Sequence, residues 1–191
     1  MTTYWAILSI PILASLTPIK AKGILVSITW QLYALILILF IGLRHETGGD
    51  WVNYLILQNK IKGDDLSQLL TLETVTEEIG YRVINWVSVH YYSGIYTTNF
   101  VCAIIFVIGL FRLCRSLPLP WIALAVATPY LIIVVAVGYT RQAAAIGIFM
   151  WALVDLMSGK NIKYFFLILL GALFHKTMLV MLPFGILFKN S

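Results

Sequence analysis

The sequence contains few charged residues and many apolar ones. Only 11% of its 191 residues are Asp, Glu, Lys or Arg, whereas 61% are hydrophobic. Soluble domains carry roughly 25% charged and 45–50% apolar residues, so the composition excludes an ordinary soluble domain. The mean hydropathy of +0.93 points the same way. The composition therefore predicts an integral membrane protein, in which each membrane helix needs about 20 apolar residues.

Cysteines and basic clusters are also scarce. The two cysteines, Cys102 and Cys114, flank one apolar run, which excludes a disulfide framework and a cysteine-based metal site. The net charge is only +5 and no dense block of Lys and Arg occurs, so no nucleic-acid partner is expected. No Ala-x-Ala cleavage pattern follows the first apolar run, which is therefore predicted to be a retained helix.

Apolar runs separated by short polar segments predict an all-α bundle of about six to seven membrane helices, forming one transmembrane domain over residues 1–191. The runs cover 4–18, 24–43, 96–111, 121–138, 142–158, 163–175 and 177–188. The last two are short for a membrane span. They predict either a hairpin with His175 and Lys176 at its outer tip or one long helix. We favour the hairpin, because an unpaired lysine inside the bilayer is costly.

Basic residues predict the orientation, because Lys and Arg collect in short cytoplasmic loops. Seven of the 13 fall on one side of the predicted spans: Lys20, Lys22, Arg112, Arg115, Lys160, Lys163 and Lys189. With that side inside, the N-terminus and a long loop over 44–95 face outward. Residues 80–94 could form an extra span, which would invert everything after them. Their polar residues recur every three positions, which instead favours an interfacial amphipathic helix with Arg82, Asn85 and Ser88 on its polar face.

Ionisable residues gather at the predicted outer boundary. The stretch "GLRHETGGDWVNY" at 42–54 follows the cleanest apolar run. Separate turns bring Arg44, Arg141 and Lys176 to similar depth. A helix beginning near an arginine suits a phosphate, and arginine binds phosphate oxygens through two parallel hydrogen bonds. This convergence predicts a site for a membrane-embedded diphosphate.

Three acidic or basic side chains lie at the same depth, namely Glu46, Asp50 and His175. Each feature also has a structural interpretation. Arg44 could be an anchor at a helix end, Gly48 and Gly49 a turn with Asp50 as a helix cap, and His175 an interfacial histidine. The small residues after Arg141, "AAAIG", predict close approach of another helix. Aromatic and amide side chains that could contact sugars are Trp51, Tyr54, Tyr81 and Gln142.

Four segments, in this order, resemble the EpsG family of bacterial membrane proteins, which is related to Wzy-type exopolysaccharide and O-antigen polymerases. They are Arg44-x-x-Thr47-Gly48-Gly49-Asp50-Trp51-x-x-Tyr54, then Gly80-Tyr81 with Asn85, then Arg141-Gln142 with Ala145, then Ala172-x-Phe174-His175-Lys176. The resemblance covers nearly all of the chain. Members of that family are longer, so the chain is expected to be an N-terminal portion of such a protein.

The resemblance implies a polysaccharide polymerase of the bacterial cytoplasmic membrane, acting on its outer face. Its substrates would be oligosaccharides on undecaprenyl diphosphate in the lipid bilayer, and its partners a flippase and chain-length regulators. Arg44, Arg141 and Lys176 would bind the diphosphate, and Asp50 would act as base, with Glu46 or His175 as alternatives. No metal or other cofactor is expected. A flippase and a non-catalytic subunit of an export complex are the competing interpretations.

Overall fold

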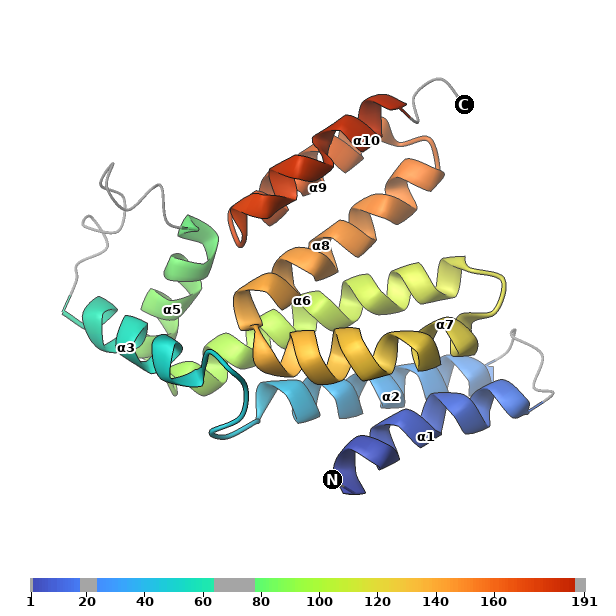
Figure 1. Cartoon of the computed structure of the whole chain (residues 1–191), viewed down its shortest axis with the longest axis horizontal. Helices are drawn as coiled ribbons and strands as arrows, with labels where there is room; N and C mark the ends of the chain where they lie inside the picture. The colour runs from blue at the N-terminus through green and yellow to red at the C-terminus, as the bar shows by residue number, and fades with distance from the viewer. Residues whose placement is uncertain (1, 18–23, 64–77, 188–191) are drawn as a thin grey trace.

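The computed structural model describes residues 2–17, 24–63 and 78–187, and within these ranges all regular elements are helices (Figure 1). Lys20, Lys22 and Lys189, together with 64–77 of the predicted outer loop, lie outside the described residues. The elements are α1 (Thr2–Leu16), α2 (Ile24–Gly42), α3 (Trp51–Ile61), α5 (Ile79–Tyr91), α6 (Ile95–Ser116), α7 (Pro120–Ala127), the π-helical η2 (Thr128–Ala136), α8 (Thr140–Met157), α9 (Asn161–Ala172), the 3₁₀-helical η3 (Lys176–Met181) and α10 (Leu182–Leu187).

Helices α6 and α8 form the centre of the fold, and they cross where both carry glycine. A methyl group on Gly147 would lie 2.5 Å from the Phe106 Cα atom, and one on Gly109 would strike the Gly147 carbonyl. Ala144 and Ala145 are also buried along α8. The prediction that "AAAIG" admits a close helix neighbour is therefore confirmed. The axis of α8 diverges from those of α1, α2 and α7, and α9, with α10 beside it, packs along α8 on the side away from them (Figure 1).

The N-terminal helices form a second layer on α6. Tyr33 of α2 donates a hydrogen bond of 2.7 Å to the Ile7 carbonyl of α1. Trp30 stacks on Trp121 of α7 with ring centroids 4.3 Å apart. Pro129 has no N–H group, so the α-helical hydrogen bonding of α7 cannot continue through it, and the chain changes there to the wider turns of η2.

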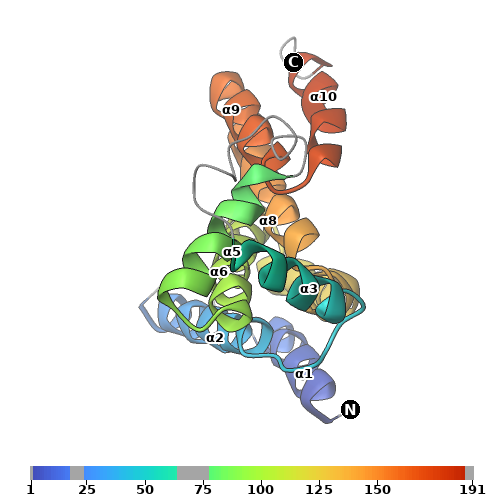
Figure 2. The same cartoon turned by 90° about the vertical axis from the view of Figure 1, so that its left-hand side faces the viewer.

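Helices α3 and α5 lie at one end of the molecule, between α2 and the final helices (Figure 2). The predicted helix over 80–94 exists as α5, but its expected polar face is oriented differently. Asn85 and Ser88 are buried, while Val83 and Val87 are exposed. Gln58 of α3 donates a hydrogen bond of 2.9 Å to Asn85. The Asn85 side chain points inward because it finds partners on α3 and α6, Gln58 and Thr98.

The last two apolar runs form the predicted hairpin. The Tyr164 hydroxyl near the start of α9 donates a hydrogen bond of 2.5 Å to the Met181 carbonyl. Near the turn, a methyl group on Gly171 would lie 2.6 Å from the Met178 Cε atom. His175 and Lys176 therefore lie at the tip of an antiparallel pair.

The opposite end of the helices is basic. Arg112 pairs with Asp155 at 2.9 Å, and Lys160 lies 4.0 Å from the same carboxylate. Arg112 also stacks over Trp151, 5.0 Å from the ring centroid. Among the described helices, α6 alone is both long and apolar enough to cross a membrane by those two criteria, and several apolar helices are shorter.

Candidate functional site: an arginine, a glutamate and a histidine beside a cationic cavity

The start of α5 is held against the turn between α9 and η3. The Gly80 N–H donates a hydrogen bond of 2.9 Å to the Leu173 carbonyl. A methyl group on Gly80 would lie 3.0 Å from that carbonyl oxygen, so a larger residue would force the two segments apart. This contact joins two of the family-like segments, Gly80-Tyr81 and Phe174-His175-Lys176, in space.

Glu78 lies immediately before α5 and bridges two of the predicted site residues. One carboxylate oxygen accepts a hydrogen bond of 2.8 Å from Arg141 Nη1, and the other lies 2.5 Å from His175 Nδ1. Only 10% of the Glu78 side chain is exposed. Its backbone is in the left-handed region, at φ 39°. Such a conformation is uncommon for a residue with a side chain, and residues held this way cluster at functional sites.

The Glu78 carboxylate also determines which imidazole nitrogen carries hydrogen. An ionised carboxylate only accepts hydrogen bonds, so Nδ1 of His175 donates to Glu78. In the neutral imidazole, Nε2 is then the acceptor. We call Arg141, Glu78 and His175 the glutamate cluster.

Arg141 lies between two aromatic rings. Its guanidinium is 5.9 Å from the Tyr54 ring centroid and 5.8 Å from that of Tyr81. Burial raises the pKa of Tyr54, and the Asp50 charge adds to the rise while Arg141 opposes it. Burial raises the pKa of Tyr81 well above its usual value. Both phenols therefore stay protonated near neutral pH and present hydroxyl donors beside the arginine.

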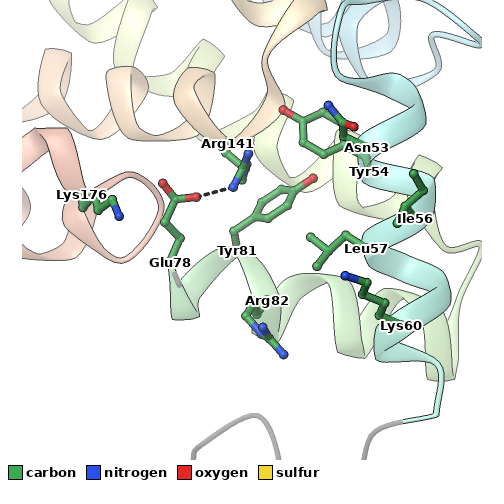
Figure 3. Close-up of a pocket in the computed structure, with 10 residues that line it drawn as sticks. All are labelled: Asn53, Tyr54, Ile56, Leu57, Lys60, Glu78, Tyr81, Arg82, Arg141 and Lys176. Carbon is green, nitrogen blue, oxygen red and sulfur yellow. Dashed lines mark hydrogen bonds and ion pairs between the residues drawn. The ribbon is translucent and has the colours of Figure 1, made fainter. Parts of the chain in front are cut away.

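These residues open onto a cavity of about 430 Å³, which we call the cationic cavity (Figure 3). Its lining comes from α3, α5, the start of α8 and the hairpin tip, and comprises Asn53, Tyr54, Ile56, Leu57, Lys60, Glu78, Tyr81, Arg82, Arg141 and Lys176. Four of these carry positive charge and one, Glu78, carries negative charge. The buried Tyr81 hydroxyl has no hydrogen-bond partner among the described residues. An excess of cations and a free donor suit an anionic ligand.

Arg44 occupies a different place from the other predicted diphosphate ligands. It is 7% exposed, and it donates hydrogen bonds to the Ala136 carbonyl at 2.8 Å, to the Thr140 hydroxyl and to the Asn99 side-chain oxygen at 3.4 Å. The Ala136 carbonyl ends η2, and Thr140 begins α8. Arg44 thus connects the end of α2 to Thr140, the residue that precedes Arg141 at the start of α8. It is not part of the lining of the cationic cavity.

The glycine turn after Arg44 packs against the same break between η2 and α8. Gly48 has φ 106°, and a methyl group there would lie 2.7 Å from the Val137 carbonyl. Asp50 precedes α3, but its side chain makes no capping hydrogen bond. Its carboxylate instead accepts a hydrogen bond of 3.4 Å from the Tyr54 hydroxyl. The side-chain amide of Asn53, another residue of the cavity lining, donates a hydrogen bond of 3.3 Å to the same carboxylate. Asp50 therefore reaches the cationic cavity through Tyr54 and Asn53.

The remaining predicted residues lie outside the cationic cavity. The Glu46 side chain is 75% exposed and 3.7 Å from His45. Trp51 is buried and packs edge-on against His45 at 5.8 Å between ring centroids. Gln142, like His175, lines a separate apolar cavity. The structure thus brings Tyr54, Tyr81, Arg141 and Lys176 into one cavity, with His175 attached through Glu78.

Sequence reasoning missed three charged residues of this site. Glu78, Lys60 and Arg82 lie in the predicted outer loop, where charged residues are ordinarily solvated. One signal was present for Glu78, because it lies two residues before Gly80 in a family-like segment. Across the ranges that the structure covers, no group of three His, Cys, Asp or Glu is arranged to hold a metal ion.

Fold and cavity together define an all-helical, strongly apolar protein with a candidate anion site at one end of its helices. The chain belongs to the EpsG family, whose model matches residues 27–191. This membership associates it with exopolysaccharide production and with the membrane. No curated protein and no solved structure matched the chain.

Proposed function

We propose that this protein is a membrane polysaccharide polymerase. It joins oligosaccharide repeat units carried on undecaprenyl diphosphate, at the outer face of the bacterial cytoplasmic membrane. The observation that carries the proposal is the glutamate cluster beside the cationic cavity. It unites residues of two family-like segments with an acid that none of those segments predicts, at a cavity with an excess of positive charge.

Exposed apolar side chains support the membrane location. Large apolar residues on the outer helices are largely uncovered, including Trp5 at 69%, Phe166 at 65% and Ile162 at 87% exposure. Soluble monomers rarely expose contiguous apolar surface on this scale, whereas lipid-facing helices do. In the proposed arrangement the main helices cross the bilayer as a multi-pass bundle, and α3 and α5 lie at its outer side.

The two ends of the helices support the orientation. Arg112, Arg115, Lys160 and Lys163 come from the ends of α6 and α9 that lie away from the cavity. The positive-inside tendency assigns that end to the cytoplasm. The cationic cavity is then on the extracytoplasmic side, where a lipid carrier presents its glycan after translocation.

The chemistry follows from the charges around the cavity. A hydroxyl of one repeat unit attacks the anomeric carbon of another, forming a carbon–oxygen bond. The bond between that carbon and the diphosphate breaks, and the lipid diphosphate leaves with the electron pair. Arg141 and Lys176 stabilise the charge that develops on the diphosphate. Removing one well-placed donor of this kind costs about 10²–10³-fold in rate in other enzymes.

The glutamate cluster supplies the base. The hydroxyl proton passes to the Glu78–His175 pair, which acts as one unit because the two groups share a hydrogen bond. Tyr54 and Tyr81 contact the sugars. Asp50, the first candidate base from the sequence, orients Tyr54, and Arg44 positions the start of α8.

The proposal is tested in a bacterial host that lacks its own polymerase. The chain is expressed with Arg141→Ala, His175→Ala or no substitution, and lipid-linked glycans are separated on gels. The wild type should restore long polymer. Both variants should accumulate single repeat units on the outer leaflet at unchanged protein levels.

Two controls match these substitutions at sites remote from the cavity. Arg115→Ala removes an arginine at the opposite end of α6, and His90→Ala removes an exposed histidine of α5. Both should retain polymer of normal length. Repeat units trapped on the inner leaflet would identify a flippase, and full polymer in every variant would leave a non-catalytic subunit.

A further inference from the structure

A second cavity, of about 540 Å³, lies on the other side of the glutamate cluster. Its walls come from α6, η2, α8 and η3. They comprise Leu113, Leu131, Gln142, Ala145, Ile146, Phe149, Met150, Leu153, His175, Thr177, Met178, Val180 and Met181. Three of these thirteen residues are polar, so we call this cavity the apolar groove.

The apolar groove and the cationic cavity meet at adjacent residues. Arg141 lines the cationic cavity, and its neighbour Gln142 lines the groove. His175 lines the groove, while its hydrogen-bond partner Glu78 lines the cationic cavity. A ligand bound to both would therefore pass its polar part over the glutamate cluster and continue as an apolar chain.

We infer that the apolar groove binds the isoprenoid tail of the lipid diphosphate, along the units nearest the phosphates. The inference rests on the proposed function for the identity of the head group. The volume of the groove is within the range of about 300–1,000 Å³ that is usual for ligand sites. Its polar residues lie at one end: Gln142 at the start of α8, His175 in the turn before η3, and Thr177 at the start of η3. An amphiphile with one charged end matches this distribution, whereas a free sugar or a soluble anion does not.

The π-helical segment contributes to the groove wall. Leu131 belongs to η2, whose wider turns follow from Pro129. Departures from α-helical geometry of this kind occur frequently at functional sites.

The exposed fraction of the groove residues differs between its floor and its rim: Met150 and Met178 are 3% and 5% exposed, whereas Val180 at the rim is 69% exposed. The groove therefore opens at the surface where lipid would lie.

The test is photo-crosslinking of the full chain in detergent. The probe is a radiolabelled undecaprenyl diphosphate with a benzophenone in the second isoprene unit, and labelled peptides are located by mass spectrometry. Label should fall on groove residues such as Phe149 and Met181. Unlabelled undecaprenyl diphosphate should reduce this labelling at least ten-fold. Phosphatidylglycerol and inorganic diphosphate at equal concentration should leave it within two-fold.

Variants that fill the groove sharpen the test. Ile146→Trp places a large ring in the groove and should reduce labelling at least five-fold. Val180→Trp changes an exposed rim residue and provides the same test where Ile146→Trp fails to fold. Leu169→Trp, on the outer face of α9 and 54% exposed, is the matched control and should label as the wild type does.

Several outcomes would overturn the inference. Equal competition by phosphatidylglycerol would identify a general lipid surface, and crosslinks between copies of the chain would identify a protein interface. Normal labelling in both groove variants would place the tail elsewhere. The crosslinking result is independent of polymer formation. Labelling of the groove together with normal polymer in the Arg141→Ala and His175→Ala variants would contradict the proposed polymerase function. Loss of polymer in those variants without labelling of the groove would contradict only the inference that the groove binds the lipid tail.

Discussion

Arg44 donates hydrogen bonds to three acceptors inside the protein, whereas the Arg141 side chain is 40% exposed at the cationic cavity. Their sequence contexts look alike, since each adjoins the end of an apolar run. The difference depends on neighbours far along the chain, the Ala136 carbonyl for Arg44 and Glu78 for Arg141. A sequence pattern locates such arginines in depth but does not reveal which way they point.

Thermal unfolding should separate the two roles. Arg44→Ala leaves buried acceptors without donors, and each hydrogen bond to a charged group contributes about 1.5–3 kcal/mol, so we expect a loss of about 3 kcal/mol or more. Arg44→Lys should not restore stability, because an ammonium lacks the planar fork of arginine. Arg141→Ala should cost less than half as much. The measurement is thermal unfolding of purified protein in detergent, and a larger loss for Arg141→Ala would contradict the assignment.

Glu78 supports a second prediction at the same scale. Glu78→Gln removes the charge that holds Arg141 and His175, while the side-chain volume is unchanged. We expect polymer formation to fall about 10²-fold, the scale of a lost acid–base or charge contribution. Membrane levels of the protein should remain within two-fold. Polymer synthesis in inverted and right-side-out vesicles provides the rate, and a wild-type rate would remove Glu78 from the mechanism.

Single residues also show where prediction from sequence stopped. Tyr54, Tyr81, Arg141 and Lys176 were expected at one site, and the structure places all four in the cationic cavity. Glu78 was not expected, because its partners lie 63 and 97 residues away in the chain. Local patterns carry no information about a pairing at that separation.

At the scale of elements, the crossing of α6 and α8 depends on a missing side chain. Gly147→Ala would place a methyl group 2.5 Å from the Phe106 Cα atom and 2.7 Å from the Ile105 carbonyl. Overpacking of this kind costs about 1–3 kcal/mol, and backbone atoms cannot yield as a flexible side chain can. We expect a lower unfolding temperature for Gly147→Ala. Gly63→Ala is the control, because no atom of the described residues lies within 4 Å of the added methyl group, and it should unfold as the wild type does.

Helix α5 shows how an element can be predicted correctly and oriented wrongly. The three-residue recurrence of polar residues does mark a helix with two faces. The rule that polar faces meet water failed because Asn85 accepts hydrogen bonds from Gln58 and Thr98, at 2.9 and 3.3 Å. Buried polar groups are stable when their hydrogen bonds are satisfied. The identity of those partners depends on the packing of α3 and α6, which no local pattern specifies.

For the whole molecule, the proposed orientation predicts which surface positions face the outside. Tyr92, after α5, is 68% exposed, and Ser158, after α8, lies at the basic end. In intact cells, a membrane-impermeant maleimide should label Tyr92→Cys and should label Ser158→Cys only after permeabilisation. The native thiols Cys102 and Cys114 are buried and provide little background. The reverse labelling pattern would place the cationic cavity in the cytoplasm.

The contact between Gly80 and Leu173 has a consequence for synthesis. A growing chain exposes Glu78 and Arg141 before the hairpin that carries His175 has left the ribosome. Until then α5 has no Leu173 carbonyl to bind, and the wall formed by Lys176 is missing. The cationic cavity therefore gains its last described wall only after α3, α5 and α8 have been synthesised, so the cavity stays open on that side in a nascent chain that has not yet formed the hairpin.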